Sequence, residues 1–334
     1  MNKNSFISAF VALRQWLREE CSREDLGSLG PVVEQAKINN GWFDRREVLY
    51  ALNYWAEKLT ETHLKNLLED LTPTPTPKRI GLILAGNIPM VGFHDVLCTL
   101  LAGHRAVVKY STNDSVIIPA LLNKLSEWNP AVNDRIEIFT RNHPFDAIIA
   151  TGSNNTARYF EAYFRDIPKI VRSNRTAIAI LSGDESDDEL HGLMHDCFRY
   201  FGLGCRSVTK LYLPNNYDLN KIFSASVPFG YAMENVKYAN NYTYQKALML
   251  LERATFLDND LLLMREHKQL YSPVSVLNYE YYSSEGELQE IIESKRNEIQ
   301  CIISKKHQPF GSAQNPPLNE YADGINTLHF LRNL

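Results

Sequence analysis

The sequence predicts an α/β protein built on parallel strands that are covered by helices on both faces. The first observation is that short, continuously apolar segments alternate with helical segments from residue 78 onward. Strands buried on both faces have this composition, and the helices between them supply the crossovers that parallel strands need. The second is that residues 5–70 show helical periodicity alone. The third is that the alternation continues beyond residue 175, in a chain whose 334 residues suit two domains of ordinary size or one large one.

The N-terminal segment carries two apolar stripes at helical spacing. They consist of Phe6, Phe10, Leu13 and Leu17, and of Val48, Leu52, Trp55 and Leu59. Such stripes are typical of helices that bury one face against a core. The run Thr72–Pro77 then alternates threonine with proline. Proline fixes φ and removes a backbone donor, so this run predicts an extended linker.

The first α/β region is predicted to contain four short strands with helices between them. The strands are expected at residues 80–85, 106–109, 136–139 and 146–150, and the helices end near residues 101, 128 and 164. Ligands of parallel sheets bind at the carboxyl ends of the strands. Asn87, Lys109 and Ser153 fall at such ends, which makes them candidates for a binding site.

The second region repeats the pattern with an acidic segment near its start. Strands are expected at residues 176–181, 207–213, 274–277 and 301–304, with a helix near 285–298. The acids between Asp184 and Glu189 precede a helix that ends near Tyr200. Acids at this position cap the helix and oppose its positive end, so they need no catalytic explanation.

Composition excludes several classes of protein. The net charge is −4, and a nucleic-acid binder usually has a basic surplus. The sequence contains no run of 18 apolar residues, so we expect no membrane span, and Met1 to Trp16 indicates an amphipathic helix instead of a signal peptide. The five cysteines are scattered without a C-x-x-C pair, which favours a reduced, cytoplasmic location. His191 and His195 are spaced for one helix face but have no obvious third ligand, so we expect no metal site.

Cys205 comes after Gly202-Leu203-Gly204, at the end of the acid-capped helix. Glycines permit backbone conformations that other residues avoid and leave room for a ligand. A thiol in such a turn is accessible, and a nearby cation or helix terminus lowers its pKa and makes it a nucleophile. A lone cysteine is otherwise an ordinary small buried residue. The local sequence leaves both interpretations open.

The strand-end residues also have two interpretations each. The Asn87 amide suits an oxyanion donor, or it shapes the turn before Pro89. Lys109 suits a ribose or phosphate, or it is a solvated strand end. Gly152 and Ser153 suit a pyrophosphate at a helix N-terminus, or Ser153 is an ordinary helix cap. The sequence has no G-x-G-x-x-G fingerprint, so a dinucleotide would not bind in the usual Rossmann manner.

Six motifs in order give the chain a resemblance to a known family. They are Gly86-Asn87-Ile88-Pro89, Val107-Val108-Lys109-Tyr110-Ser111, Thr151-Gly152-Ser153, the stretch Ser182–Cys205, Tyr271-Ser272-Pro273-Val274 and Pro309-Phe310-Gly311-Ser312. From about Gly41 onward the chain resembles the aldehyde dehydrogenase superfamily, and within it the long-chain acyl-CoA reductases of the bacterial luciferase pathway. Each motif is weak alone, and the order of all six is what carries the resemblance.

The resemblance implies a fold and a role for each region. It implies an N-terminal helical segment with the Thr-Pro linker over 1–78, a Rossmann-like coenzyme-binding domain over 79–174 and a catalytic domain over 175–334. Cys205 is implied to be the nucleophile.

The remaining site residues take their roles from the same resemblance. Asn87 is implied to be an oxyanion donor, Lys109 and Ser111 to be ligands of the adenosine ribose, and Gly152 and Ser153 to form the pyrophosphate turn. A family glutamate that holds the nicotinamide ribose is replaced by Gln269. The chain is also short for the superfamily, so its oligomerisation hairpin is expected to be reduced, and a homo-oligomer remains an option.

A second departure bears on the reaction. Hydrolytic members carry a glutamate that activates water, and the matching position here is Val171. Without that base, water attacks a thioester slowly, whereas transfer between thiols needs no such base. The resemblance therefore implies reduction of an acyl-CoA or an acyl-carrier substrate by NADPH or NADH, with an acyl-activating enzyme as a further candidate partner.

NADPH is favoured because no acid follows Lys109 before Asp114, and an acid near the ribose would repel a 2′-phosphate. Two alternatives remain. One is a hydrolytic aldehyde or semialdehyde dehydrogenase, and the other is a non-redox acyl-binding or partner-binding protein on the same fold.

Overall fold

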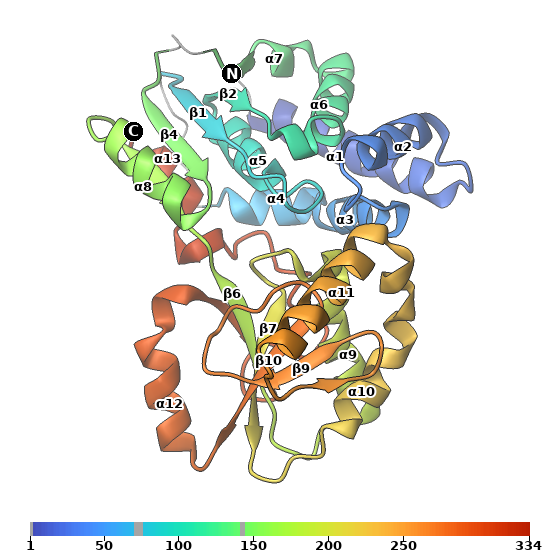
Figure 1. The fold of residues 1–334 in the computed structure, drawn as a ribbon. Helices are drawn as coiled ribbons and strands as arrows, with labels where there is room; N and C mark the ends of the chain where they lie inside the picture. Colours follow the sequence, from blue (N-terminus) through green and yellow to red (C-terminus); the bar gives the residue numbers. More distant parts are fainter. Residues whose placement is uncertain (1–2, 70–75, 141–143) are drawn as a thin grey trace. The chain divides into compact units, whose positions relative to one another are not determined.

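The computed structural model describes residues 3–69, 76–140 and 144–334, and the chain divides into two compact units (Figure 1). Unit 1 comprises Met1–Asn174 and Pro317–Leu334, and unit 2 comprises Arg175–Pro316. Most of the predicted Thr-Pro linker lies outside the described residues. None of the described helices combines the length and the apolar character that crossing a membrane requires.

Unit 1 begins with helices whose apolar stripes are buried, as predicted. The helices are α1 (Lys3–Ser22), α2 (Gly30–Asn39), α3 (Arg45–Lys58) and α4 (Glu61–Leu67), with the 3-10 turn η1 (Gly27–Leu29) before α2. Phe10, Leu13 and Leu17 of α1 are fully buried. Asp44 caps α3 by accepting from the N–H groups of Arg46 and Glu47. The spacing of apolar residues was therefore sufficient to predict α1 and α3.

The sheet of unit 1 consists of five parallel strands in the order β3-β2-β1-β4-β5. Its strands are β1 (Arg79–Ile83), β2 (Arg105–Lys109), β3 (Ile136–Ile138), β4 (Ala147–Thr151) and β5 (Lys169–Arg172). The helices between them are α5 (Phe93–Leu101), η2 (Thr112–Asp114), α6 (Ile117–Trp128), α7 (Pro130–Asn133) and α8 (Asn154–Tyr163). This strand order is that of half a Rossmann fold, and the order reverses between β1 and β4. Right-handed crossovers therefore place α5 and α8 on opposite faces.

Strand β5 was not predicted. Its burial alternates along Lys169–Arg172, and the buried member Arg172 is charged. Arg172 Nη1 lies 2.6 Å from Asp95 Oδ2, and Nη2 donates to Thr327 Oγ1 over 2.9 Å. A buried arginine is tolerated because a carboxylate and a hydroxyl pair with it. Nothing in the local sequence reveals those partners.

The C-terminal residues correct the predicted domain boundary. Residues 175–334 were assigned to one domain, but residues 317–334, with η6 (Ala322–Gly324) and α13 (Thr327–Arg332), group with unit 1. The Nε2 atom of buried His104 lies 2.9 Å from Leu331 O, and His94 Nε2 lies 2.9 Å from Leu318 O. These bonds, together with Arg172, hold the returning segment on the first sheet.

Unit 2 contains a six-stranded sheet in the order β11-β6-β7-β10-β9-β8. Its strands are β6 (Thr176–Ile180), β7 (Val208–Pro214), β8 (Leu257–Asp258), β9 (Leu263–Glu266), β10 (Val276–Tyr282) and β11 (Ile299–Ile303). All pairs are parallel except β8 with β9. Strands β8 and β9 were not predicted, because they are short and lie beside a loop-rich stretch. The second α/β unit itself is as predicted.

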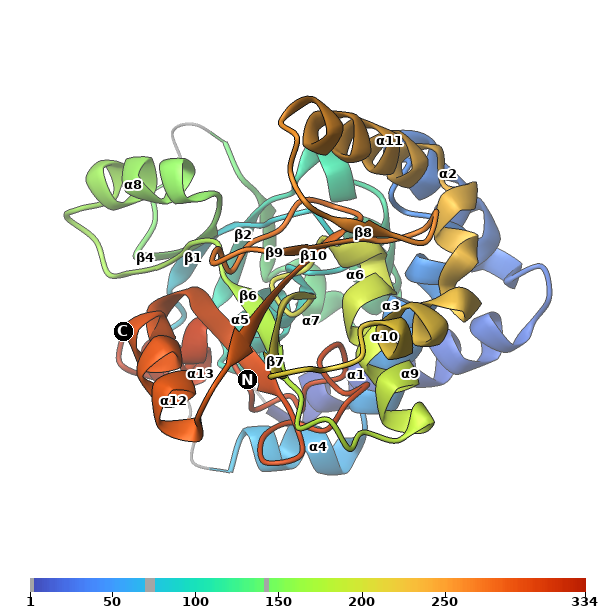
Figure 2. The ribbon, with the colours of Figure 1, turned by 60° about the horizontal axis from the view of Figure 1, so that its bottom comes forward.

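Helices cover both faces of this sheet (Figure 2). They are α9 (Asp187–Phe198), α10 (Asn220–Ser226), α11 (Val236–Leu251) and α12 (Glu285–Ser294), with the 3-10 segments η3 (Arg199–Gly202), η4 (Val227–Glu234) and η5 (Arg296–Glu298). Leu288 of α12 packs on Ile178 and Tyr212, and Tyr242 of α11 packs on Leu263. The predicted acidic cap of α9 is a capping box between Ser186 and Glu189.

Candidate functional site

Five of the predicted site residues lie at the carboxyl edge of the unit 1 sheet. Asn87 follows β1, Lys109 ends β2 with Ser111 just beyond it, and Gly152 and Ser153 follow β4. These three strands are neighbours in the order β2-β1-β4. The arrangement brings the five residues to the same edge, beside the point where the strand order reverses. That point is where open parallel sheets bind ligands.

The loops after β1 and β2 are fitted closely to each other. A Cβ atom on Gly86 would lie 2.5 Å from Ser111 Oγ, so only glycine fits beside that hydroxyl. Asp114 Oδ2 accepts the N–H of Met90 over 2.8 Å. The Asp114 side chain is buried, and burial raises the pKa of its carboxyl to about 6. Asn87 is thus held on a shaped loop with an exposed side chain.

Lys109 and Ser153 present polar groups at this edge. The exposed Lys109 side chain places Nζ 5.9 Å from the centre of the Phe139 ring. Ser153 caps α8, and its Oγ accepts the Thr156 N–H over 3.3 Å. A Cβ on Gly152 would lie 2.9 Å from Thr156 Cβ, so glycine is required for this close turn into α8. The capping interpretation of Ser153 therefore holds, and a capped helix N-terminus still attracts an anion.

Cys205 lies in unit 2, in the turn between η3 and β7, and is partly exposed. The backbone before it is unusual. Tyr200 and Phe201 have φ of 54° and 55°, and Gly202 has φ of 75°. Each left-handed aromatic residue costs about 1–3 kcal/mol, and such conformations cluster at functional sites. The Gly202 that sequence analysis singled out is the third member of this left-handed run.

The residues Gly204–Ser207, termed here the Cys205 turn, are fixed by Ser207. The Ser207 N–H donates to Gly204 O over 3.0 Å, and Ser207 Oγ accepts the Gly204 N–H over 3.1 Å. Gln314 Nε2 donates to the same Oγ over 3.3 Å. Ser207 is fully buried. Sequence analysis missed Ser207 and Gln314, because nothing in the sequence shows that residues 107 apart are bonded.

Gln269 lies in the segment His267–Tyr271, termed here the Gln269 segment, between β9 and β10. Side chains from the sheet hold its backbone carbonyl groups. Asn278 Nδ2 donates to Gln269 O over 3.1 Å and to Tyr271 O over 3.0 Å, and Thr209 Oγ1 donates to Leu270 O over 2.7 Å. The Gln269 side chain itself is exposed.

Lys210 is the least expected part of this support. Its side chain is fully buried, and Nζ donates to His267 O and lies 2.9 Å from Glu280 Oε2. Burial lowers the pKa of Lys210, and the hydrogen bond to Glu280 opposes that shift. A charge buried inside a sheet is costly and needs a partner. Here Lys210 positions the segment that carries the predicted cofactor residue Gln269. Sequence analysis did not identify this role of Lys210.

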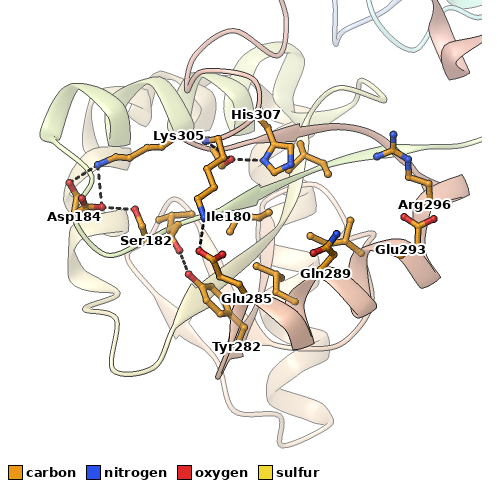
Figure 3. A pocket seen from close by; sticks show the side chains of 16 residues that line it. Ile180, Ser182, Asp184, Tyr282, Glu285, Gln289, Glu293, Arg296, Lys305 and His307 are labelled. Atoms are coloured by element: carbon orange, nitrogen blue, oxygen red, sulfur yellow. Dashed lines mark hydrogen bonds and ion pairs between the residues drawn. The ribbon is translucent and has the colours of Figure 1, made fainter.

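A cavity of about 520 Å³ lies at the carboxyl edge of the unit 2 sheet (Figure 3). It lies beside the carboxyl ends of β6 and β11, whereas the Cys205 turn precedes the amino end of the parallel strand β7. Ile180, Leu288 and Ile302 are among its apolar lining. Lys305 pairs with Asp184 at 3.1 Å and Lys306 with Glu285 at 2.5 Å. Its lysines are therefore already neutralised, and they do not form an anion site.

The histidines of α9 are packed against an aromatic ring. The rings of His191 and His195 are 5.2 Å apart and lie 5.2 Å and 5.1 Å from that of Phe229. Across the described parts of the chain, no three histidine, cysteine, aspartate or glutamate side chains gather as a metal site requires. No disulfide joins any of the five cysteines.

Comparison with known proteins gives a resemblance to one family over part of the chain, and a fold. Residues 76–222 match the family model for acyl-CoA reductase (LuxC). This match includes Asn87, Lys109, Ser111, Gly152, Ser153 and Cys205. No curated protein sequence matches the chain.

Solved aldehyde dehydrogenases share its architecture. The NAD⁺ complex of the Bacillus cereus enzyme has a TM-score of 0.64 at 11% identity, over 91% of this chain and 72% of that one. The Mycobacterium tuberculosis enzyme with NAD⁺ has a TM-score of 0.65 at 15% identity, over 100% and 84%. A Pseudomonas syringae enzyme with NAD⁺ and octanal has a TM-score of 0.64 at 12% identity, over 90% and 71%.

Two α/β units with these strand orders match the architecture of solved aldehyde dehydrogenases, so the chain has the aldehyde dehydrogenase fold. The fold class predicted from the sequence is therefore confirmed. Over residues 76–222 the chain resembles the LuxC acyl-CoA reductases, and the likeness to the solved structures shows that it shares the aldehyde dehydrogenase fold.

Proposed function

We propose that the protein reduces an acyl-CoA, or a related acyl thioester, to the aldehyde through a thioester on Cys205. The family match over residues 76–222 is the observation that carries this proposal. The strained backbone before Cys205 supports it, because such strain is retained where it serves function.

The cysteine thiolate attacks the acyl carbonyl, and the carbonyl oxygen gains negative charge. The Asn87 amide and the Cys205 N–H are the proposed donors to that oxygen, and one such donor contributes about 3–4 kcal/mol. Collapse expels CoA as its thiolate and leaves the acyl group on sulfur. After reduction at the acyl carbon, the resulting hemithioacetal releases the aldehyde and restores the thiol.

The residues of unit 1 fit a nicotinamide dinucleotide. Gly152 makes the close turn against Thr156 that leads into the N-terminus of α8, and backbone N–H groups at a helix N-terminus attract an anion such as a pyrophosphate. Lys109 and Ser111 are proposed to hold the ribose, Gly152 and Ser153 the pyrophosphate, and Gln269 the nicotinamide ribose. When bound, the cofactor supplies the hydride.

NADPH is the proposed form of that cofactor. The acid nearest after Lys109 is Asp114, and it is buried with one oxygen engaged by the Met90 N–H. It is therefore not the exposed ribose-binding acid that selects against a 2′-phosphate. Fluorescence titration should give a lower Kd for NADPH than for NADH, and equal values would contradict this preference.

Labelling of the protein by radiolabelled acyl-CoA tests the central step. Cys205→Ala should abolish the label. Cys197→Ala is the matched control and should retain it, because burial raises the pKa of the Cys197 thiol far above neutrality and keeps it protonated. Undiminished labelling of Cys205→Ala would overturn the proposal.

Two further outcomes distinguish the alternatives. Acid production from an aldehyde without CoA would favour a hydrolytic dehydrogenase, against the expectation from Val171. Acylation of Cys205 without binding of either dinucleotide would favour a non-redox acyl-binding protein. The reductase instead predicts aldehyde formation that depends on acyl-CoA and the reduced cofactor together.

A further inference from the structure

One loop of unit 2, far along the chain from the nucleophile, is packed directly on helix α9. Residues Pro309–Gln314 form this loop, termed here the clamp loop. Gly192 of α9 meets it so closely that a Cβ there would lie 2.9 Å from Phe310 C and 3.0 Å from Gly311 N. Gly311 has φ of 83°, a conformation that favours glycine. A pair of glycines thus allows backbone-to-backbone contact.

Asp196, one helical turn after Gly192, fastens the clamp loop. Its Oδ2 accepts the Gly311 N–H over 2.7 Å, and its Oδ1 accepts the Ala313 N–H over 2.9 Å. Asp196 and Ala313 are both fully buried. A buried carboxylate that receives two backbone donors in this way orders the segment strongly.

The clamp loop in turn bonds the Cys205 turn at two points. Gln314 Nε2 donates to Ser207 Oγ, the atom that also accepts the Gly204 N–H. Arg206 Nη1 donates to Ala313 O over 3.5 Å. The residues immediately before and after Cys205 are therefore connected, through the clamp loop, to the Asp196 carboxylate.

We propose that Asp196 is a positioning residue, which holds the Cys205 turn in its reactive geometry through the clamp loop, Gln314 and Ser207. The inference rests on the proposed role of Cys205 as the nucleophile. A nucleophile displaced by about 1 Å can lose about 100-fold in rate.

The charge state of Asp196 should control the clamp. Burial raises the pKa of its carboxyl to about 7, although the Gly311 and Ala313 N–H groups oppose that shift. The titratable or charged side chains next to it along α9 and its C-cap are His195, Cys197 and Arg199, and Arg206 of the Cys205 turn donates to the clamp loop at Ala313 O. The clamp loop itself contributes no titratable side chain. The ionised Asp196 carboxylate accepts hydrogen bonds from both N–H groups. In the protonated acid one oxygen carries a proton and becomes a donor, so it no longer accepts its N–H group as well.

Hydrogen exchange tests the connection directly. Asp196→Asn should accelerate amide exchange in peptides covering both 309–316 and 203–208, and Ser207→Ala should accelerate it in 203–208. The matched control is Asp188→Asn, an exposed acid of the same helix, which should change neither. Acceleration confined to 309–316 in Asp196→Asn would overturn the proposal, because the aspartate would then support only its own loop.

Kinetics provides the second readout. An asparagine resembles the protonated aspartate, so the kcat of Asp196→Asn should approach that of the wild type below about pH 6. Above about pH 8 the wild type should be about 10–100-fold faster, with KM for acyl-CoA little changed. A ratio that does not vary with pH would overturn the proposal. Failure of acyl labelling at Cys205 would instead count against the proposed function. The exchange experiment would still show whether Asp196 orders the Cys205 turn through the clamp loop.

Discussion

The Cys205 turn and the Gln269 segment are both held in place by buried charged side chains from other parts of unit 2, and the two charges are of opposite sign. A buried carboxylate, Asp196, accepts N–H groups to order the first. A buried ammonium, Lys210, and the Asn278 amide donate to carbonyl groups to order the second. Lys210 has Glu280 as a counter-charge, whereas Asp196 is stabilised by backbone N–H groups. The turn around the proposed nucleophile is therefore the one whose support has a pKa near neutral pH.

The largest expected effect is on the Gln269 segment. Lys210→Met leaves the Glu280 carboxylate and the His267 carbonyl group without their donor. Removing one partner of a buried ion pair costs about 3–5 kcal/mol. Because the Glu280 side chain is partly exposed, we expect a cost near the lower end of that range. We expect a loss of about 3 kcal/mol in the free energy of unfolding, measured by urea denaturation.

A double variant shows whether the charge pair is the cause. Lys210→Met with Glu280→Gln removes the stranded carboxylate and should recover part of the loss. If the double variant is as unstable as the sum of the two single variants, the two residues act independently, and the comparison with Asp196 loses its basis.

The second effect is the pH dependence of stability that Asp196 contributes. Its pKa is about 7 in the folded chain against an ordinary value of 3.8. Between these values the folded chain keeps a proton that the unfolded chain has lost, so ionisation of Asp196 lowers stability as pH rises. From pH 5 to pH 8 this group should remove about 2–3 kcal/mol from the free energy of unfolding.

The Asp196→Asn variant isolates that contribution. It should lose less stability than the wild type between pH 5 and pH 8, because the titrating group is gone while all others remain. Parallel curves for the two proteins, from urea unfolding at each pH, would show that Asp196 is not the titrating group.

The smallest effect concerns the glycine contact under the clamp loop. Gly192→Ala places a methyl group against the Phe310 and Gly311 backbone, which cannot move as a flexible side chain would. Overpacking of this kind costs about 1–3 kcal/mol, measured as a fall in thermal stability. Gly230→Ala is the matched control, since nothing lies within 4 Å of the added Cβ. Equal stability of the two variants would mean that the clamp loop adapts freely.

The sequence by itself determined the fold class and the order of the motifs. The periodicity of α1 and α3 and the capping box of α9 are local properties, because they depend on residues three or four positions apart. Apolar composition was likewise enough for β1, β2, β4, β6 and β7. The predicted site residues of unit 1 follow from the same reasoning, since each comes directly after an apolar strand.

Only the tertiary structure decided what supports those residues. Asp196 and Gly311 are 115 positions apart, and Lys210 and His267 are 57 apart. The sequence gives no sign of these pairings, because a buried charge is tolerated only once the fold has brought its partners to it. The same reason explains the missed strand β5 and the return of residues 317–334 to unit 1, since both depend on Arg172 reaching Asp95 and Thr327. The local sequence pattern therefore predicted that Cys205, the proposed nucleophile, lies in a turn, while long-range hydrogen bonds hold that turn in place.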